Sequence, residues 1–148
     1  GTPATIASGA YQQALAKARP GLKVVAQATP LFVPLVEEGW LEGEVTEKVA
    51  RTYLDPLIRE RIRVLVLACT HYPLLKGVLG KVLGPEVRLV DSSEACAASL
   101  QASEGERKEK GELKIFLTDE PGPFLGRVES FLGKGAVGSI ERIHLPIA

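Results

Sequence analysis

The sequence has 148 residues, of which 45% are hydrophobic and 24% charged, and its 18 basic residues equal its 18 acidic residues. This balance gives no reason to expect nucleic acid or an anionic membrane as a partner. No apolar run approaches the roughly 20 residues of a membrane-spanning helix, and no signal peptide is recognisable. We therefore expect a cytoplasmic protein that is large enough to bury a core.

Residues 8–19 begin with a serine that can cap a helix, and Pro20-Gly21 stops this helix. Residues 22–26 then predict a short buried strand. Residues 30–38 open with proline and end before a glycine, which favours a short helix or turn. Residues 44–61 carry apolar side chains at three-to-four spacing, which predicts a longer helix.

Residues 64–68 are a continuous apolar run, which is typical of a strand buried on both faces of a parallel sheet. The elements expected after it are helix 72–83, strand 87–90, helix 92–101, strand 113–117, helix 124–132 and strand 139–145. This alternation predicts an α/β fold with a mostly parallel sheet flanked by helices. Ligands of such sheets bind beyond the carboxyl ends of the strands.

Three polar side chains follow the apolar run directly, namely Cys69, Thr70 and His71. They come at the start of a predicted helix, whose N–H groups and dipole favour a thiolate and can hold a carboxylate. A protonated His71 would favour the thiolate too. The alternative interpretations are a buried structural cysteine and a histidine that makes a local hydrogen bond. Half a metal site is less favoured, because no second pair of ligands stands out.

The second cysteine, Cys96, lies among alanines in helix 92–101, which indicates packing of small residues. Both thiols are expected to be free, and two thiols are too few for a structural zinc site. The chain contains no methionine and opens with Gly1-Thr2-Pro3, so we interpret it as part of a longer protein.

The stretch Leu67-Ala68-Cys69-Thr70-His71-Tyr72-Pro73-Leu74-Leu75 resembles the signature around the second catalytic cysteine of glutamate racemases. The segments at residues 1–6, 30–38 and 90–92 resemble three further family segments in the same order. The resemblance implies a flavodoxin-like fold of the Asp/Glu racemase type, in which the protein is a truncated two-domain enzyme. Residues 1–100 would be its second α/β domain, and residues 101–148 are expected to pack on the absent N-terminal domain.

The resemblance implies a cofactor-independent, two-thiol interconversion of L- and D-glutamate for peptidoglycan synthesis, with no pyridoxal phosphate, metal or nucleotide. Cys69 would be the second catalytic thiol, and His71 would assist its proton transfer. Thr70, His71 and Glu37 would bind the substrate. For Glu37, an exposed carboxylate at a helix end is an equally weighted interpretation.

The partners implied by the resemblance are glutamate, the N-terminal domain of the same enzyme and a second copy in a homodimer. The family's first catalytic block, Cys-Asn-Thr, does not occur in this sequence, so we expect the isolated chain to be inactive. Two alternatives stay open: an aspartate or hydantoin racemase of the same family, and a non-catalytic carboxylate-binding module. Thr2 and Thr5 are interpreted as capping hydroxyls rather than pocket residues, and Thr29 replaces a cysteine common in the family.

Overall fold

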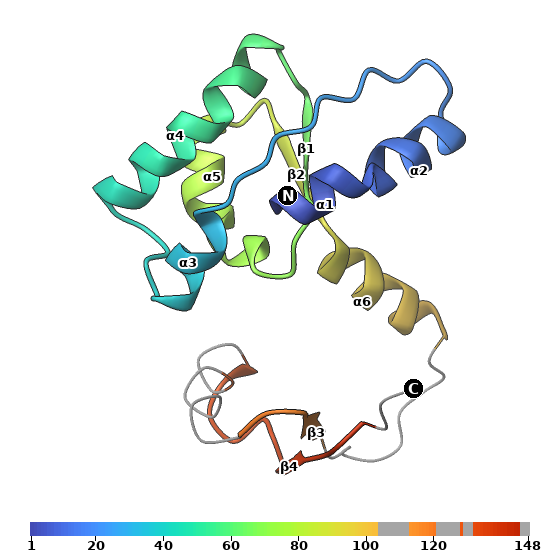
Figure 1. The fold of residues 1–148 in the computed structure, drawn as a ribbon, viewed down its shortest axis with the longest axis vertical. Helices are drawn as coiled ribbons and strands as arrows, with labels where there is room; N and C mark the ends of the chain where they lie inside the picture. The colour runs from blue at the N-terminus through green and yellow to red at the C-terminus, as the bar shows by residue number, and fades with distance from the viewer. Residues whose placement is uncertain (104–112, 121–127, 129–131, 146–148) are drawn as a thin grey trace. The chain divides into compact units, whose positions relative to one another are not determined.

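A computed structural model describes residues 1–103, 113–120, 128 and 132–145 of the chain (Figure 1). The chain divides into two units, Gly1–Ser103 and Glu104–Ala148, and each is described by itself. The first unit contains α1 (Pro3–Ser8), α2 (Ala10–Ala18), α3 (Phe32–Glu37), α4 (Glu44–Arg59), β1 (Val64–Leu67), the 3-10 helix η1 (Tyr72–Leu75), α5 (Lys76–Leu83), β2 (Arg88–Asp91) and α6 (Ser92–Ser103).

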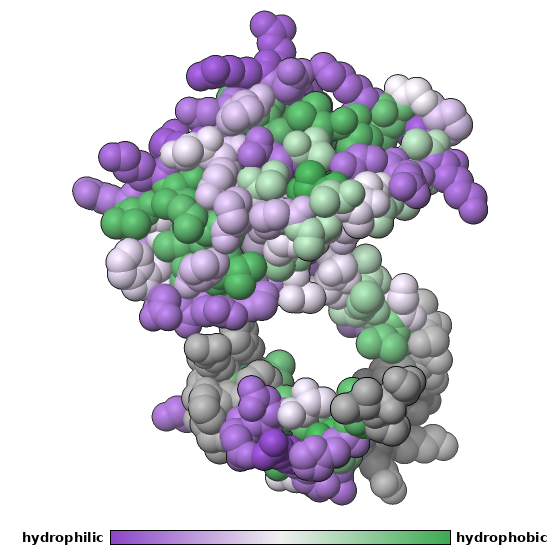
Figure 2. Space-filling view, viewed as in Figure 1, coloured by the Kyte–Doolittle hydropathy of each residue, from purple (hydrophilic) through white to green (hydrophobic). Residues whose placement is uncertain are grey.

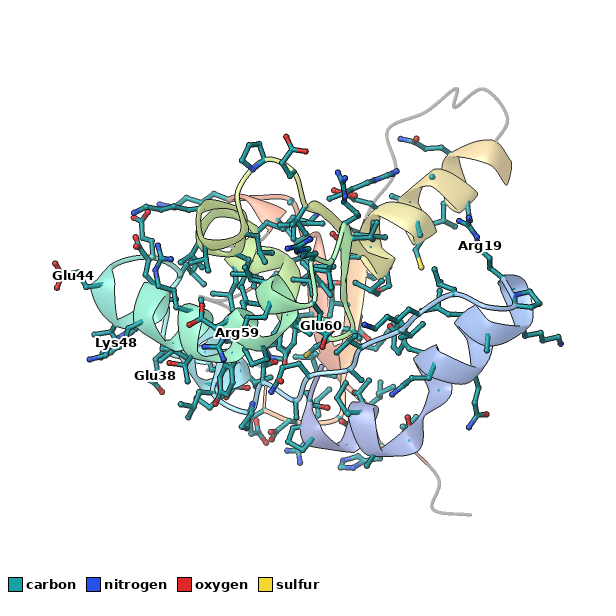
Figure 3. The ribbon with its side chains drawn as sticks, turned by 90° about the horizontal axis from the view of Figure 1, so that it is seen from above. Arg19, Glu38, Glu44, Lys48, Arg59 and Glu60 are labelled. Atoms are coloured by element: carbon teal, nitrogen blue, oxygen red, sulfur yellow. The ribbon has the colours of Figure 1, made fainter. Side chains whose placement is uncertain are left out.

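The strands β1 and β2 pair in parallel, with a register that runs from Val64 opposite Arg88 to Leu67 opposite Asp91. Helices α4 and α5 lie on one side of this pair, and α1 and α2 lie on the other (Figures 1 and 3). In Figure 3, the labels Glu44 and Arg59 mark the two ends of α4. The predicted α/β class with parallel strands is confirmed. The strands predicted at 64–68 and 87–90 are confirmed too, with β1 one residue shorter and β2 shifted by one residue.

The core of the first unit lies where α3, α4, η1 and α5 meet. Its largest fully buried side chains are Tyr72, Leu54, Leu75, Leu79 and Thr46. The ring of Phe32 on α3 packs edge-on against Tyr53 of α4 and Tyr72 of η1, with ring centroids 5.4 and 5.3 Å apart. Each such buried side chain contributes about 1.5–3 kcal/mol. This packing fixes α3 against η1 and thereby holds the end of β1 in place.

Of the two elements predicted for the N-terminal region, the helix forms and the strand does not. The expected helix 8–19 is confirmed as α2, which runs from Ala10 to Ala18 and whose Ala10 N–H donates to Ser8 Oγ. The sequence did not predict the short helix α1 before it, which ends where Gly9 adopts a φ of 65°. The expected strand 22–26 does not form, and Leu22 and Val25 are 42% and 39% exposed. The physical reason is that β1 pairs only with β2 among the described residues, so segment 22–26 has no strand beside it.

The later helices of the first unit agree with the sequence prediction within a few residues. The expected helix 72–83 is a 3-10 turn, η1, that continues as α5. The side chain of Cys96 on α6 is exposed rather than packed among its alanines, which corrects the prediction of small-residue packing. The residues of α6 from Ser92 to Gln101 are all exposed, and among the described elements the helix packs mainly against β2.

The second unit contains β3 (Lys114–Leu117) and β4 (Ser139–Arg142), which pair in parallel with Lys114 opposite Ser139. Both strands were predicted, although β4 is shorter than the expected 139–145. Val128 is buried. The expected helix 124–132 lies mostly outside the described residues.

The surface of the first unit carries apolar residues around α3 and the start of α4, seen as green areas in Figure 2. The exposed large apolar side chains of this region are Leu31, Trp40, Leu41 and Val45. Within the described parts of the chain, no helix has both the length and the apolar character needed to cross a membrane.

Candidate active site

The candidate site lies at the carboxyl end of β1, where the chain makes a tight turn. Tyr72 N–H donates a hydrogen bond to the Cys69 carbonyl at 3.3 Å, so Cys69, Thr70 and His71 are held in that turn. Cys69 is half-buried and packs against the core, whereas Thr70 is exposed. The thiol therefore has a fixed inner side and an accessible outer side.

The imidazole of His71 lies between the thiol and a carboxylate. Its Nδ1 is 4.0 Å from Cys69 Sγ and 3.4 Å from Thr70 Oγ1. Its Nε2 is 3.6 Å from Glu37 Oε1, and both side chains of this pair are partly exposed. A histidine in this position can exchange a proton with the thiol, because the carboxylate stabilises the positive charge that the ring then carries.

Glu37 reaches this site through the packing of α3, because it is the last residue of that short helix. Phe32, at the other end of the helix, is buried against Tyr72, the residue that follows His71. The same aromatic contact that completes the core therefore sets the distance between Glu37 and His71. The structure thus brings together all four residues singled out from the sequence: Cys69, Thr70, His71 and Glu37.

A buried hydrogen-bond pair supports the turn from below. Thr29 Oγ1 donates to the Tyr72 hydroxyl at 2.7 Å, and that hydroxyl donates to the Thr29 carbonyl at 3.1 Å. Burial raises the pKa of Tyr72, while the hydrogen bond from Thr29 opposes the shift. Thr29 thus does more than fill space, because its hydroxyl satisfies a phenol that has no access to water.

A second polar cluster, which the sequence analysis did not single out, lies at the end of the neighbouring strand. Asp91 ends β2 with its side chain almost fully buried, and it forms an ion pair with Lys76 at the start of α5. Its Oδ1 also accepts hydrogen bonds from Ser93 Oγ and, at 3.0 Å, from Glu94 N–H.

The hydrogen bond from Lys76 is the main reason that the pKa of Asp91 is lowered well below its usual range, and Ser93 and Glu94 N–H add to the effect. The hydrogen bonds of Lys76 with Asp91 and with Glu94 in turn raise the pKa of Lys76. The sequence did contain one signal for this cluster. A lysine in the first turn of a helix opposes the helix dipole and therefore suggests a nearby anion.

The remaining polar residues of the N-terminal helix have structural positions. Thr2 Oγ1 accepts a hydrogen bond from Thr5 N–H at 3.2 Å and lies 2.8 Å from Thr5 Oγ1, so Thr2 caps α1 as predicted. In the part of the chain that the structure describes, no group of three or more His, Cys, Asp and Glu side chains is arranged to hold a metal ion.

Comparison with curated proteins finds similarity to glutamate racemases. No protein-family model matches the chain. The glutamate racemase of Syntrophus aciditrophicus (strain SB) is 45% identical over 151 residues, which cover 98% of this chain and 56% of that protein. The glutamate racemase of Aquifex pyrophilus is 51% identical over 121 residues, which cover 80% of this chain and 45% of that protein. The chain is therefore similar to glutamate racemases over most of its own length.

Solved structures of glutamate racemases share the fold. The enzyme of Francisella tularensis, in complex with D-glutamate, superposes with a TM-score of 0.81 at 32% identity, over 97% of this chain and 56% of that one. The enzyme of Thermus thermophilus, in complex with beta-chloro-D-alanine, gives a TM-score of 0.76 at 36% identity, over 98% of this chain and 55% of that one. The chain therefore spans about half the length of these relatives and corresponds to their C-terminal part.

Proposed function

We propose that the chain is the C-terminal part of an enzyme that interconverts L- and D-glutamate without a cofactor, and that Cys69 is one of its two proton-transferring thiols. The observation that carries the proposal is the alignment of Cys69, His71 and Glu37 at the carboxyl end of β1. The similarity to glutamate racemases supports the choice of glutamate as the substrate. The product D-glutamate would serve peptidoglycan synthesis.

The chemistry requires a base on one side of the α-carbon and an acid on the other. The α-proton beside a carboxylate is weakly acidic, so positioned donors must stabilise the charge that develops on that carboxylate. In the proposed mechanism, Cys69 as a thiolate removes the α-proton from one enantiomer. In the reverse direction it returns a proton as a thiol.

His71 would hold the proton of the Cys69 thiol while Cys69 is a thiolate. When the thiol ionises, its proton passes to Nδ1 of His71, and Glu37 then faces a positively charged ring through Nε2. Glu37 would also attract the ammonium group of the substrate. The exposed Thr70 hydroxyl and the N–H groups of the turn are the groups proposed to bind a substrate carboxylate.

The other half of the site would come from the N-terminal part of the longer enzyme, which would carry the second thiol. Residues 101–148 are proposed to pack on that part. A homodimer and a cytoplasmic location stay predictions. They follow from the resemblance and from the sequence, respectively.

The proposal is tested by racemisation assays of the longer polypeptide with single cysteine changes. Cys69→Ser should lower the rate in both directions by roughly 10²- to 10⁴-fold, because each turnover uses both thiols. The matched control is Cys96→Ser, which removes an exposed thiol on α6 and should leave the rate unchanged. A Cys69→Ser enzyme that keeps its rate within threefold would contradict the proposed role.

Assays of the same longer polypeptide also distinguish the alternative functions. A panel of glutamate, aspartate and a hydantoin tests the choice of substrate, and faster turnover of either of the latter two would reassign it. A carboxylate-binding module that performs no chemistry would bind glutamate without racemising it, and the Cys69→Ser change would leave that binding unaffected.

A further inference from the structure

The turn that carries the candidate site has few bonds of its own. Its helix η1 is a 3-10 helix of four residues, and the side chain of His71, at the N-cap, makes no capping hydrogen bond. The backbone bonds of the turn are local, from Tyr72 N–H to the Cys69 carbonyl and from Leu74 N–H to the His71 carbonyl. Because 3-10 helices have poorer hydrogen-bond geometry than α-helices, contacts outside the turn must fix the position of His71.

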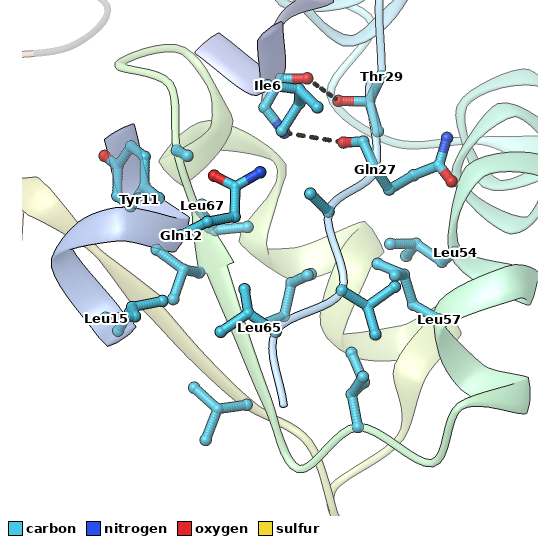
Figure 4. Close-up of a pocket in the computed structure, with 18 of the residues that line it drawn as sticks. Ile6, Tyr11, Gln12, Leu15, Gln27, Thr29, Leu54, Leu57, Leu65 and Leu67 are labelled. Atoms are coloured by element: carbon cyan, nitrogen blue, oxygen red, sulfur yellow. Dashed lines mark hydrogen bonds between the residues drawn. The ribbon is translucent and has the colours of Figure 1, made fainter. Parts of the chain in front are cut away.

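The side chain of Tyr72 connects this turn with a distant segment of the chain. Its hydroxyl accepts a hydrogen bond from Thr29 Oγ1 and donates one to the Thr29 carbonyl. In Figure 4, Thr29 lies on the segment that leads into α3. Apart from the approach of His71 to Glu37, no other side-chain hydrogen bond or ion pair in the described residues links residues 69–75 to a distant part of the chain.

These bonds close a path of contacts around the site. The Thr29 carbonyl that accepts from Tyr72 also accepts from Phe32 N–H at 3.2 Å, and Phe32 is the first residue of α3. Glu37 is the last residue of this helix, which at six residues is only about 9 Å long. So short a helix moves as one piece, so the position of its first turn sets that of Glu37. The path returns to the turn through His71, next to Tyr72 in the chain.

We propose that the Tyr72 hydroxyl and Thr29 are positioning residues, which hold His71 in register with Glu37 so that His71 can accept the proton of Cys69. This inference rests on the function proposed above for Cys69. Burial raises the pKa of Tyr72, so its phenol stays a neutral donor while a thiolate forms at Cys69. The site therefore gains a fixed contact without a further negative charge beside the thiolate.

The ring and the hydroxyl of Tyr72 have separable roles. The ring packs edge-on against Phe32, and a phenylalanine at position 72 would keep this contact. The hydroxyl adds a directional bond, because a buried phenol is stable only where it has a partner. Tyr53 offers a comparison within the same cluster. Its ring also packs edge-on against Phe32, but its hydroxyl makes no hydrogen bond in the described part of the chain.

The test compares Tyr72→Phe with the matched control Tyr53→Phe. The alkylation of Cys69 by iodoacetamide is measured by mass spectrometry at pH 7 and pH 9.5, in a Cys96→Ser background. The Tyr72→Phe chain should stay folded, because the Thr29 hydroxyl keeps the Gly1 carbonyl, 3.3 Å away, as an acceptor. Thermal unfolding checks this. The racemisation parameters kcat and KM are measured on the longer polypeptide with the same changes.

Tyr72→Phe should slow alkylation at pH 7 by about three- to tenfold, the net effect of one hydrogen bond. At pH 9.5 the rate should equal that of the parent, because hydroxide then ionises the thiol without His71. In the longer polypeptide kcat should fall by a similar factor, with KM within twofold. Tyr53→Phe should change none of these quantities.

A second pair of variants makes the same comparison from the other partner, and it replaces the first if Tyr72→Phe does not fold. Thr29→Val removes the hydroxyl and should slow alkylation at pH 7 as Tyr72→Phe does. Thr29→Ser keeps a hydroxyl and should retain most of the parent rate. The double variant of Thr29→Val and Tyr72→Phe should be no slower than either single variant, because both changes remove the same contact.

Three outcomes would overturn the inference. If His71→Gln slows alkylation at pH 7 but Tyr72→Phe and Thr29→Val do not, the pair has no positioning role, and the function proposed for Cys69 stands. Equal slowing at pH 7 and pH 9.5 would mean that the variants change access to the thiol rather than its proton transfer. A Cys69 that is inert in the parent chain would contradict the proposed function, and this inference with it.

Discussion

At the scale of single residues, His71 has a position that gives each of its ring nitrogens a different neighbour. Nδ1 faces the thiol of Cys69, and Nε2 faces the carboxylate of Glu37. An amide side chain could keep some of these contacts, but it could not accept the proton of the thiol. The reactivity of Cys69 should therefore report directly on His71.

We expect His71→Gln to slow the alkylation of Cys69 by iodoacetamide at pH 7 by roughly tenfold, because the thiolate loses its proton acceptor. The measurement is made by mass spectrometry in a Cys96→Ser background, so that only one thiol reacts. Glu37→Gln should have a smaller effect in the same direction, because it removes only the charge that faces the ring. An alkylation rate that is unchanged in both variants, or a Cys69 that is inert in the parent chain, would favour the binding-module alternative.

At the scale of elements, Asp91 connects three parts of the fold, namely the end of β2, the start of α5 through Lys76 and the start of α6 through Glu94 N–H. Its pKa is lowered in the folded state, chiefly by Lys76. A lowered carboxyl pKa adds stability above the unfolded value of about 4, and this stability is lost as the pH falls toward the folded value.

Asp91→Asn should therefore lower the free energy of unfolding by about 1–2 kcal/mol at pH 7. The expected loss is no larger because Lys76 is partly exposed, so solvent screens its ion pair with Asp91. The difference between parent and variant should shrink below pH 4, where the aspartate of the unfolded parent chain binds a proton. Urea unfolding at pH 7 and pH 3 measures both values. The exposed Asp55→Asn is the control and should change stability by less than about 0.5 kcal/mol. A difference as large at pH 3 as at pH 7 would rule out the charge as its cause.

Most elements could be predicted from the sequence because their patterns are local. The apolar run at 64–68 and the helical spacing at 44–61 are sufficient for β1 and α4. Segment 22–26 is also apolar apart from Lys23, but a strand needs a neighbour, and the sequence of one strand does not contain its partner. Helix α1 was not predicted, because its six residues are too few to show a helical pattern of their own.

Residues of the candidate site could be predicted where they are neighbours in the sequence and not where packing brings them together. Cys69, Thr70 and His71 are consecutive, so one turn brings them together. Glu37 was found only through the resemblance to a family, because its distance to His71 is set by the packing of Phe32 against Tyr72. The pair of Asp91 and Lys76 was missed, since 15 residues and a change from helix to strand separate them.

At the scale of the whole molecule, the chain carries two thiols, and they lie on different elements. Cys69 follows β1, and Cys96 is exposed on α6. Two-thiol racemisation needs an acid and a base on opposite faces of one carbon, which this pair is not expected to supply.

We therefore expect the isolated 148-residue chain to form no D-glutamate from L-glutamate above the rate of its own Cys69→Ser variant. Chiral chromatography of the reaction mixture after long incubation measures this. The longer polypeptide, assayed in parallel, is the positive control. Formation of D-glutamate by the isolated chain that disappears in the Cys69→Ser variant would show that one half of the enzyme is sufficient.

The position of Gly1 also bears on the order in which the molecule can assemble during synthesis. Gly1 accepts a hydrogen bond from Thr29 N–H and lies close to the Ala68 carbonyl, so both neighbours leave the ribosome later than Gly1 does. Contacts of long sequence separation form slowly, because the loops between them must close first. These contacts of Gly1 therefore form only after the residues up to Ala68 have been translated, and until then the segment around Gly1 stays exposed to non-native contacts.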